Sequence, residues 1–416
     1  MSWKSSINDR LGLSNTKYDF YFGDYTYEDF SKGKMAASLP FQKVGWAKRA
    51  VEVRSNKTKF DKFENDALGL NELFDKYRVK EAFDKIKDDV LICGCGFLAV
   101  NDDRVFPFTA QEATGTFNWS EQNLKDGVAV FRENTEKKTD KIGALNIPDA
   151  YVEYLPDRTI AHEKGVVTVA PNGIGRPLIG LLTHNSTAKR PFGQSVISST
   201  ARNAIVDASR TIRQAMIAAY HYNTKVDVIL GADNQTSVEK IESQTGDTLK
   251  IGPNENGQIP QIGEFAQHAM QPFNDTILTA ARNFCSDTKL SLANLGISSD
   301  APQSTEALEI VNDDLRDSIL AWQNELGEQL KYFGVTLWMH ENNVRVLDDN
   351  IIEQIKAIRP VFLSVYRQDV SKFGDGLVKI TQQAPGIVKS RSLWRNLGLT
   401  SDEIDEVITS AENVVQ

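Results

Sequence analysis

The chain has 416 residues, of which 41% are hydrophobic and 25% are charged. This composition is typical of a folded soluble protein, and the length predicts two to four structural units instead of one core. The formal net charge is −9 and no long run of Lys and Arg occurs, which argues against a protein that grips nucleic acid by its phosphates. A conduit through which DNA slides needs no such patch, so the composition does not exclude a protein of that class.

Membrane and secretion signals are weak in this sequence. The longest nearly apolar run, residues 90–100, contains two glycines and is too short to span a bilayer. The start, Met-Ser-Trp-Lys-Ser-Ser, lacks the apolar core of a secretion signal. The cysteines (Cys93, Cys95 and Cys285) form no disulfide framework, so we expect a protein of a reducing cytosol with no membrane span.

The first third of the chain predicts an arm followed by mixed helix and strand. Residues 1–40 are rich in Tyr and Phe among Gly and Asp, which favours an arm that packs on a neighbour or on its own domain. Amphipathic spacing predicts helices that open at Trp46, at Leu70 and at Glu81. The apolar run at 90–100 predicts a buried strand, with glycines where another backbone approaches closely.

The middle of the chain predicts an antiparallel sheet and then a long rod. Short alternating segments over residues 105–183 favour the sheet. Residues 195–223 contain no Gly and no Pro, and alanine is the most frequent of their apolar residues, so we expect a helix roughly 40 Å long that packs closely beside other helices. Ser195 is the expected N-cap of this helix.

The rest of the chain predicts a small αβ segment and several helices. Residues 224–263 contain strand-like and turn-rich stretches. Pro272 suits the first turn of a second helix, and a polar loop follows Gly296. Residues 308–330 repeat apolar side chains at spacings of three and four, which predicts a third helix with one continuous apolar stripe. We expect helices at 373–384, 390–397 and 401–415 near the end of the chain.

No motif in this sequence predicts catalysis. A Walker loop is missing, because Gly33-Lys34 lacks both the earlier glycine and the following Ser or Thr. Gly193-Gln-Ser195 lacks the last glycine of a nucleophile elbow. Cys93 and Cys95 could share one face of a strand, but no His nearby completes a zinc site, so we interpret them as buried thiols. The acidic pairs Asp313–Asp314 and Asp348–Asp349 are interpreted as solvated acids. We therefore expect no enzyme, no cofactor and no metal.

Several motifs follow one another in an order that resembles the portal proteins of long-tailed double-stranded DNA bacteriophages. The strongest is Lys-Arg-Pro-Phe-Gly-Gln-Ser at 189–195, directly before the long helix. Gly-Trp-x-x-x-x-Val at 45–51 and Asp-x-Leu-Ile-x-Gly-x-Gly-Phe-x-x-Val at 89–100 are similar to the same family. Gly-Gln-Ile-Pro-Gln-Ile-Gly at 257–263 and Leu-x-x-Leu-Gly at 292–296 extend the resemblance, which covers about residues 41–335.

The resemblance implies an α+β portal subunit and a division of the chain. Its expected parts are an N-terminal arm (1–40), a wing (41–194), stem helix 1 (195–223), a clip (224–263), stem helix 2 (264–290), a tunnel loop (291–304), the long wing helix with following strands (305–358) and a helical crown (359–416). The clip is short for the family, which leaves its strand pairing open. Implied site residues are Ile297, Ser298, Ser299, Asp300, Gln303 and Ser304 in the tunnel loop, Ala201, Ala208, Ala215 and Ala219 at the stem interface, and Asn234, Asn254 and Asn256 on the clip.

The same resemblance implies a structural function. It predicts a ring of twelve copies at one capsid vertex through which double-stranded DNA enters and leaves. The implied partners are other copies of the chain, the terminase motor, the major capsid protein, a scaffold protein where one exists, and head–tail connector proteins. The expected location is the virion, after assembly in the host cytoplasm. Two alternatives from other classes stay open: a phage-encoded enzyme, and a structural adaptor without a channel.

Overall fold

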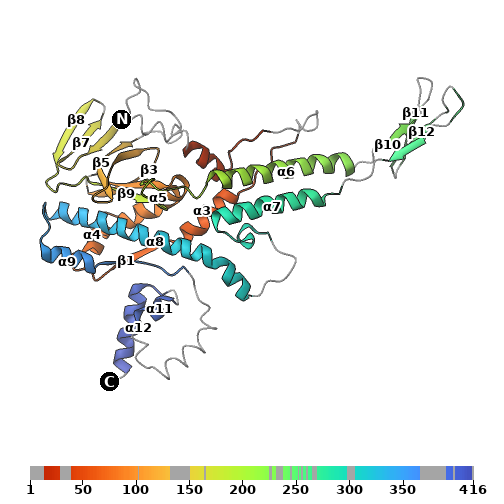
Figure 1. Cartoon of the computed structure of the whole chain (residues 1–416). Helices are drawn as coiled ribbons and strands as arrows, with labels where there is room; N and C mark the ends of the chain where they lie inside the picture. Colours follow the sequence, from red (N-terminus) through yellow and green to blue (C-terminus); the bar gives the residue numbers. More distant parts are fainter. Residues whose placement is uncertain are drawn as a thin grey trace. The chain divides into compact units, whose positions relative to one another are not determined.

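The structure is a computed structural model, and we describe its two compact units separately. The first unit contains Met1–Tyr25, Gly45–Arg202 and Asn283–Gln416, and the second contains Thr26–Val44 and Asn203–Arg282. Both helices and strands are present, so the chain is α+β (Figure 1). The residues described are 14–28, 39–101, 103–131, 150–163, 165–223, 227–230, 238–243, 246–251, 253, 256–258, 261–264, 269–297, 305–365, 390–396 and 399–414.

Three helices of the first unit follow one another between residues 46 and 93, with the strand β1 (Phe60–Glu64) between the first two. They are α3 (Trp46–Lys57), α4 (Leu70–Lys76) and α5 (Val79–Cys93), which confirms the helices predicted from Trp46, Leu70 and Glu81. The strand predicted over 90–100 is wrong in its first half, because α5 continues to Cys93. Gly94, with a φ of +101°, ends the helix in the left-handed conformation that favours glycine. A buried apolar run is compatible with either element, so only the packing separates them.

A three-stranded antiparallel sheet forms the centre of this unit, in the order β3 (Arg104–Thr109), β2 (Cys95–Asn101) and β9 (Ile179–Thr183). Register places Gly96 and Gly180 on one face. A β-carbon at Gly96 would lie 2.7 Å from Ile86 of α5. One at Gly180 would lie 2.7 Å from Phe333 of α8. The two helices therefore cover this face side by side, and small residues let them approach.

A five-stranded antiparallel sheet lies against the other face, which confirms the antiparallel strands predicted over 105–183 but divides them between two sheets, because β3 and β9 pair with β2. Ile179 of β9 points toward it, because a β-carbon added at Gly127 of β5 would come within 2.7 Å of that side chain. The strand order follows the chain: β4 (Ala113–Asn118), β5 (Asn123–Phe131), β6 (Ala150–Tyr154), β7 (Arg158–Glu163) and β8 (Val166–Pro171).

The long helix α8 (Thr305–Glu341) carries the predicted apolar stripe and continues beyond it. Its members Leu315, Ile319, Trp322, Leu326 and Leu330 are all buried, which confirms the stripe over the described side chains. Two glycines allow close packing on the same helix. A β-carbon at Gly327 would lie 2.6 Å from Pro360, and one at Gly334 would lie 3.0 Å from Phe74. The helix thus contacts both earlier and later parts of the chain.

The segment after α8 differs from the prediction of strands up to residue 358. Asp349–Ala357 forms the helix α9, and only then does the strand β14 (Arg359–Phe362) follow. β14 pairs in antiparallel fashion with β1 (Phe60–Glu64), so residues 359–362 belong to this sheet and not to a helical crown. The cause is a pairing between segments about 300 residues apart, which no local pattern reveals.

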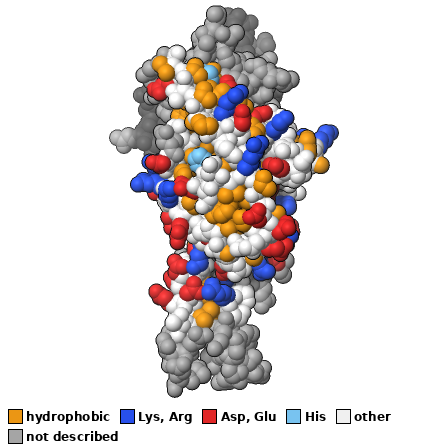
Figure 2. Space-filling view, turned by 90° about the vertical axis from the view of Figure 1, so that its left-hand side faces the viewer, with side chains coloured by type: hydrophobic (Ala, Val, Ile, Leu, Met, Phe, Trp, Pro, Cys, Tyr) orange, Lys and Arg blue, Asp and Glu red, His pale blue; other side chains and the backbone are white. Residues whose placement is uncertain are grey.

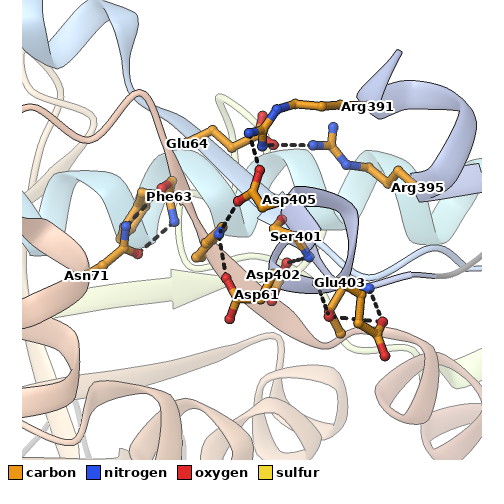
Figure 3. Close-up of polar contacts among 12 residues, drawn as sticks. Asp61, Phe63, Glu64, Asn71, Arg391, Arg395, Ser401, Asp402, Glu403 and Asp405 are labelled. Atoms are coloured by element: carbon orange, nitrogen blue, oxygen red, sulfur yellow. Dashed lines mark hydrogen bonds and ion pairs between the residues drawn. The ribbon is translucent and has the colours of Figure 1, made fainter. Parts of the chain in front are cut away.

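The last described helices, α11 (Arg391–Asn396) and α12 (Ser401–Val414), are held to β1 by charged side chains (Figure 3). Lys62 contacts Asp402 at 2.7 Å and Asp405 at 3.5 Å. Arg391 and Arg395 both contact Glu64. The predicted start at Ser401 is confirmed. Thr400 and Glu403 form a capping box there, since the Thr400 amide donates to Glu403 and the Glu403 amide to the Thr400 hydroxyl. The helix predicted at 373–384 lies outside the described residues.

The second unit contains most of two helices, which Figure 1 shows running beside each other. They are α6 (Ser199–Asn223) and α7 (Gln271–Thr288), so the rod begins four residues later than predicted, whereas the helix predicted near Pro272 is confirmed. The described residues of 224–263 form two antiparallel pairs and no helix, which leaves the helical part of the expected αβ segment unsupported. The pairs join β10 (Asp227–Leu230) to β13 (Gln261–Glu264) and β11 (Val238–Ser243) to β12 (Gly246–Ile251). Over the described part of the chain, no helix is both long and apolar enough to cross a bilayer.

Candidate functional site

The turn at residues 190–195 is the most tightly built feature at the start of the rod. Thr187 and Arg190 exchange backbone hydrogen bonds of 3.2 and 2.9 Å, and the Gly193 amide donates to the Arg190 carbonyl at 3.0 Å. Gly193 has a φ of +70°, which favours glycine. A β-carbon there would lie 2.3 Å from the Gly94 carbonyl oxygen and 2.7 Å from that of His184. No other residue type fits without moving the backbone.

Backbone hydrogen bonds seat this turn on the end of α5. The Gln194 amide donates to the His184 carbonyl at 2.7 Å, and the Val196 amide donates to the Leu91 carbonyl at 3.0 Å. The Ser195 hydroxyl donates to the Ile92 carbonyl at 2.6 Å and accepts from the Ile197 amide at 2.9 Å. The prediction of Ser195 as the N-cap of the rod is therefore wrong, because its hydroxyl ties the turn to α5.

Ser198 is the residue that caps α6. Its hydroxyl oxygen accepts from the Ala201 amide at 3.0 Å, three residues on, as an N-cap does. The same hydroxyl donates to the Asp287 carboxylate at 2.5 Å. Asp287 belongs to the last turn of α7, so one serine links the beginning of the first rod helix to the end of the second.

A polar edge of α8 holds the segment that leads into the turn. The Trp322 indole donates to the Thr183 carbonyl at 3.0 Å. The Glu325 carboxylate accepts from the Thr183 hydroxyl at 2.6 Å and from the amides of Asn185 and Ser186 at 2.9 and 3.0 Å. Gln329 exchanges bonds of 2.9 and 2.5 Å with Thr183. We call residues 183–198, with the α5 and α8 groups that hold them, the hub.

Trp322, Glu325 and Gln329 of α8 were not predicted as members of a site. Trp322 was assigned only to the apolar stripe, and Glu325 and Gln329 were not singled out. A signal was available, because these three follow at spacings of three and four along one edge of the stripe. Their partner segment could not be found, since it lies about 140 residues earlier in the chain.

A cavity of about 320 Å³ lies beside the hub, and a buried arginine side chain forms part of its wall. Arg54 of α3 lines it, is only 3% exposed, and donates to the carbonyls of Ala50 and Thr288. Burial lowers the pKa of Arg54 to about 10. Desolvation also lowers the pKa of His184, whose Nδ1 donates to the Gln194 carbonyl at 2.7 Å. The hydrogen bonds of Arg54 join α3 to the end of α7, and that of His184 joins the preceding segment to the turn. The hub therefore holds several chain segments together.

The predicted stem-interface alanines divide into two groups. Ala201 and Ala208 are fully buried within a single chain, so they cannot also form the outer face of a subunit, and this part of the prediction is wrong. Ala215 and Ala219 are half-buried, and Met216 between them is 37% exposed. A place for Ala215 and Ala219 in a contact between subunits stays a prediction.

The N-terminal arm covers part of α6 within the second unit. The Arg213 guanidinium lies 4.2 Å from the centre of the Phe41 ring and donates to the Leu39 carbonyl at 2.6 Å. The Tyr27 and Phe41 rings meet edge to face at 5.2 Å. Of the two expectations for the arm, packing on a neighbour or on its own chain, the described residues show the second.

The predicted tunnel-loop and clip residues lie mostly outside the described residues. In the loop, only Ile297 is described. It follows Gly296, which has a φ of +77° and ends the 3₁₀ helix Leu292–Leu295. In the clip, only Asn256 is described, and it is exposed. The others in these two sets are Ser298, Ser299, Asp300, Gln303, Ser304, Asn234 and Asn254.

The described residues hold no group of three or more His, Cys, Asp or Glu side chains that could bind a metal. Cys93 ends α5 whereas Cys95 begins β2, so the idea that both lie on one strand face is wrong. Burial raises the pKa of Cys93 to about 12 and that of Cys285 to about 11, which disfavours thiolates. Figure 2 shows Lys and Arg interspersed with Asp and Glu on one face of the chain, without a single-sign patch.

Comparison with known proteins finds similar chains among solved structures, two of which come from gene transfer agent particles. No protein-family model and no curated protein matches the chain. A chain from the virion of a native gene transfer agent particle is similar over 92% of this chain and 99% of its own length, at 14% identity and a TM-score of 0.48. A chain from the neck of a native gene transfer agent particle, computed with C12 symmetry, is similar over 95% of this chain and 98% of its own length, at 13% identity and a TM-score of 0.46. Likenesses at this level carry no argument about function.

Proposed function

We propose that the chain is the subunit of a bacteriophage portal, a ring at one capsid vertex through which double-stranded DNA passes. The observation that carries the proposal is the turn at 190–195. The sequence motif that resembles the portal family is also a place where the backbone leaves little freedom, since a β-carbon at Gly193 would lie 2.3 Å from the Gly94 carbonyl oxygen. A motif in which Arg190, Gly193, Gln194 and Ser195 all have structural contacts is stronger support than the same residues in a loose loop.

The architecture around the turn fits a device that bears load. Hydrogen bonds from α5, α8 and α7 converge on the start of α6, so a force along the rod is transmitted to the sheets through many bonds. The portal proposal assigns α6 and α7 to the stem and the β10–β13 and β11–β12 pairs to the clip. The tunnel loop at 297–304, with Asp300, is proposed to face the DNA.

The proposed partners follow from the same assignment. They are further copies of this chain in a twelve-fold ring, a terminase at the clip during packaging, head–tail connector proteins afterwards, and the major capsid and scaffold proteins around the wing. The chain itself is proposed to be structural and not enzymatic. A purified preparation should therefore show no ATP hydrolysis until a terminase is added.

Negative-stain imaging with light scattering tests the proposal. A closed ring with a central hole supports a portal. Stable monomers that turn over a substrate would favour the alternative enzyme, and open polymers would favour an adaptor without a channel. Either result contradicts the proposal, and neither result depends on which residues form the contacts between subunits.

A further inference from the structure

The C-terminal helices α11 and α12 contact β1 through side chains of opposite charge (Figure 3). The Lys62 ammonium of β1 lies 2.7 Å from the Asp402 carboxylate and 3.5 Å from that of Asp405. One residue earlier on the strand, the Asp61 carboxylate accepts from the Ser401 amide at 3.0 Å, where α12 begins. Charged side chains of one strand therefore hold the first two turns of the last helix.

The ion pairs continue from α12 to α11. Asp405 also pairs with Arg391 of α11, and Glu64 of β1 pairs with both Arg391, at 3.6 Å, and Arg395. Water reaches much of this network, because the side chains of Asp405 and Arg391 are 44% and 47% exposed and that of Asp402 is 89% exposed. Exposed ion pairs are individually weak, and salt screens them.

The apolar contact of these two helices is small. Among their described side chains, Ile404 is the one apolar side chain that is fully buried. Leu393, Trp394, Val407 and Ile408 are only half-buried. The helix α8, by contrast, buries a whole stripe of large apolar residues. Since apolar burial is the main stabilising contribution in most packed helices, the docking of α11 and α12 depends to an unusual degree on charge.

Two polar atoms in this contact are buried without a hydrogen-bond partner. They are the Nε of Arg395 and the hydroxyl oxygen of Ser401, both in residues that bind β1. A buried polar group without a partner opposes docking, because water would satisfy it once the helices separated from the strand. The docked state is thus stabilised by ion pairs that salt screens and is opposed by unsatisfied groups.

We propose that α11 and α12 form an ion-held latch, which separates from β1 as the ionic strength rises and docks again as it falls, while the rest of the first unit stays folded. Salt screens charges but does not weaken apolar burial, so the packed stripe of α8 should persist. A helix of 14 residues is marginal by itself in water, so α12 should lose protection of its amides when it separates. The latch acts within one chain and requires no ring.

Hydrogen exchange of the full chain in about 0.05 M and about 1 M NaCl tests the latch, because the higher concentration shortens the range of electrostatic attraction to about 3 Å. The amides of residues 405–412 in α12 should exchange on the order of tenfold faster at the higher concentration. The amides of residues 315–330 in α8 are the internal reference, and their exchange rates should stay unchanged.

Two double variants form a matched pair. Lys62→Gln/Glu64→Gln removes both β1 members of the ion pairs, and Glu353→Gln/Lys356→Gln removes an exposed ion pair within α9. Neither variant changes the net charge. The first should exchange α12 amides faster already at low salt and lose most of the dependence on salt, whereas the second should behave as the wild type. A change in packing alone would not remove the dependence on salt.

Several results would overturn the latch. Equal α12 exchange at both salt concentrations would show that charge does not hold the helices, as would a full salt effect in Lys62→Gln/Glu64→Gln. Unprotected α12 amides in the wild type at low salt would show that the helices are not docked. Acceleration of α8 together with α12 would mean that salt unfolds the whole unit. Light scattering of the same samples reports ring formation, whose absence would contradict the portal proposal and leave the latch untouched.

Discussion

Gly193 and Gly94 lie back to back where the turn before the rod meets the end of α5. A β-carbon at Gly193 would come within 2.3 Å of the Gly94 carbonyl oxygen, and one at Gly94 would come within 3.0 Å of the Gln194 backbone. Both glycines have positive φ, so each position excludes side chains for two reasons at once. The relationship joins two of the motifs that carry the resemblance, which lie about 100 residues apart in the sequence.

Gly193→Ala should therefore destabilise the first unit strongly. The left-handed backbone costs about 1–2 kcal/mol and the forced contact adds about 1–3 kcal/mol. Gly165→Ala is the control, because Gly165 has a φ of +85° but open space around it. Its loss should be only the backbone cost, about 1–2 kcal/mol. Urea unfolding of the three proteins measures this, and equal losses in both variants would contradict the tight contact.

Glu325→Ala should destabilise the hub by about 2–4 kcal/mol, because the amides of Asn185 and Ser186 and the Thr183 hydroxyl lose a charged acceptor. Glu328 lies one turn along the same helix and forms an exposed ion pair with Lys331. Glu328→Ala should cost less than about 0.5 kcal/mol. Thermal unfolding of the Glu325→Ala and Glu328→Ala variants measures both losses of stability. If the loss in Glu325→Ala is as small as that in Glu328→Ala, the Glu325 carboxylate does not hold residues 183–186.

The lowered pKa of His184 predicts that the folded protein loses stability at mildly acidic pH. Desolvation lowers its pKa in the folded chain, and Arg54 and Lys289 lower it further, whereas the Gln194 carbonyl and Glu325 act in the opposite direction. The unfolded state therefore binds a proton first as the pH falls below about 6.5. The free energy of unfolding should be constant above that pH and fall by up to about 1.4 kcal/mol per pH unit below it.

His184→Gln, whose amide can still donate to the Gln194 carbonyl, should lose less stability between pH 7.5 and pH 5.5 than the wild type. The lowered pKa values of Asp402 and Glu341, caused first by hydrogen bonds from Lys62 and Lys76, act only near pH 4 and below, so they do not contribute in this window. Urea midpoints at several pH values measure the effect. Parallel pH profiles of the two proteins would exclude His184 as the source.

Ala208→Glu and Ala215→Glu should behave differently, although both lie on the same helix. Ala208 is 0% exposed, so a carboxylate there should cost more than about 3 kcal/mol and unfold the region around it. Ala215 is half-buried, so Ala215→Glu should leave a folded chain that assembles poorly into rings. Light scattering with circular dichroism distinguishes these results. Normal rings from Ala215→Glu would remove the distal half of α6 from the subunit interface.

Asp300→Lys tests the proposed tunnel loop. Twelve aspartates would form an acidic collar that repels DNA only over about 8 Å at physiological salt, whereas twelve lysines would bind phosphates by counterion release. We expect intact capsids with reduced DNA filling, or filled capsids with slow ejection. Quantification of packaged and ejected DNA beside the wild type measures both. Wild-type rates in both assays would show that the loop does not line the constriction.

The sequence by itself determined the elements whose signals are local. The 3.6-residue periodicity of α8 and the uninterrupted helix formers of α6 act within a few turns, so their existence and approximate bounds could be predicted. The absence of a Walker loop and the candidate motif at 189–195 were also readable from the chain alone. These features depend on neighbours in sequence, and no tertiary contact is needed to recognise them.

Only the tertiary structure decided how those elements are used. The run at 90–100 is helix and then strand because Gly94 turns against Gln194, and Ser195 is a tether instead of a cap because Ile92 lies within its reach. Residues 359–362 form the strand β14 because β1 offers them a partner. In each case the deciding contact joins segments far apart in the chain, where burial and hydrogen bonding override local preference.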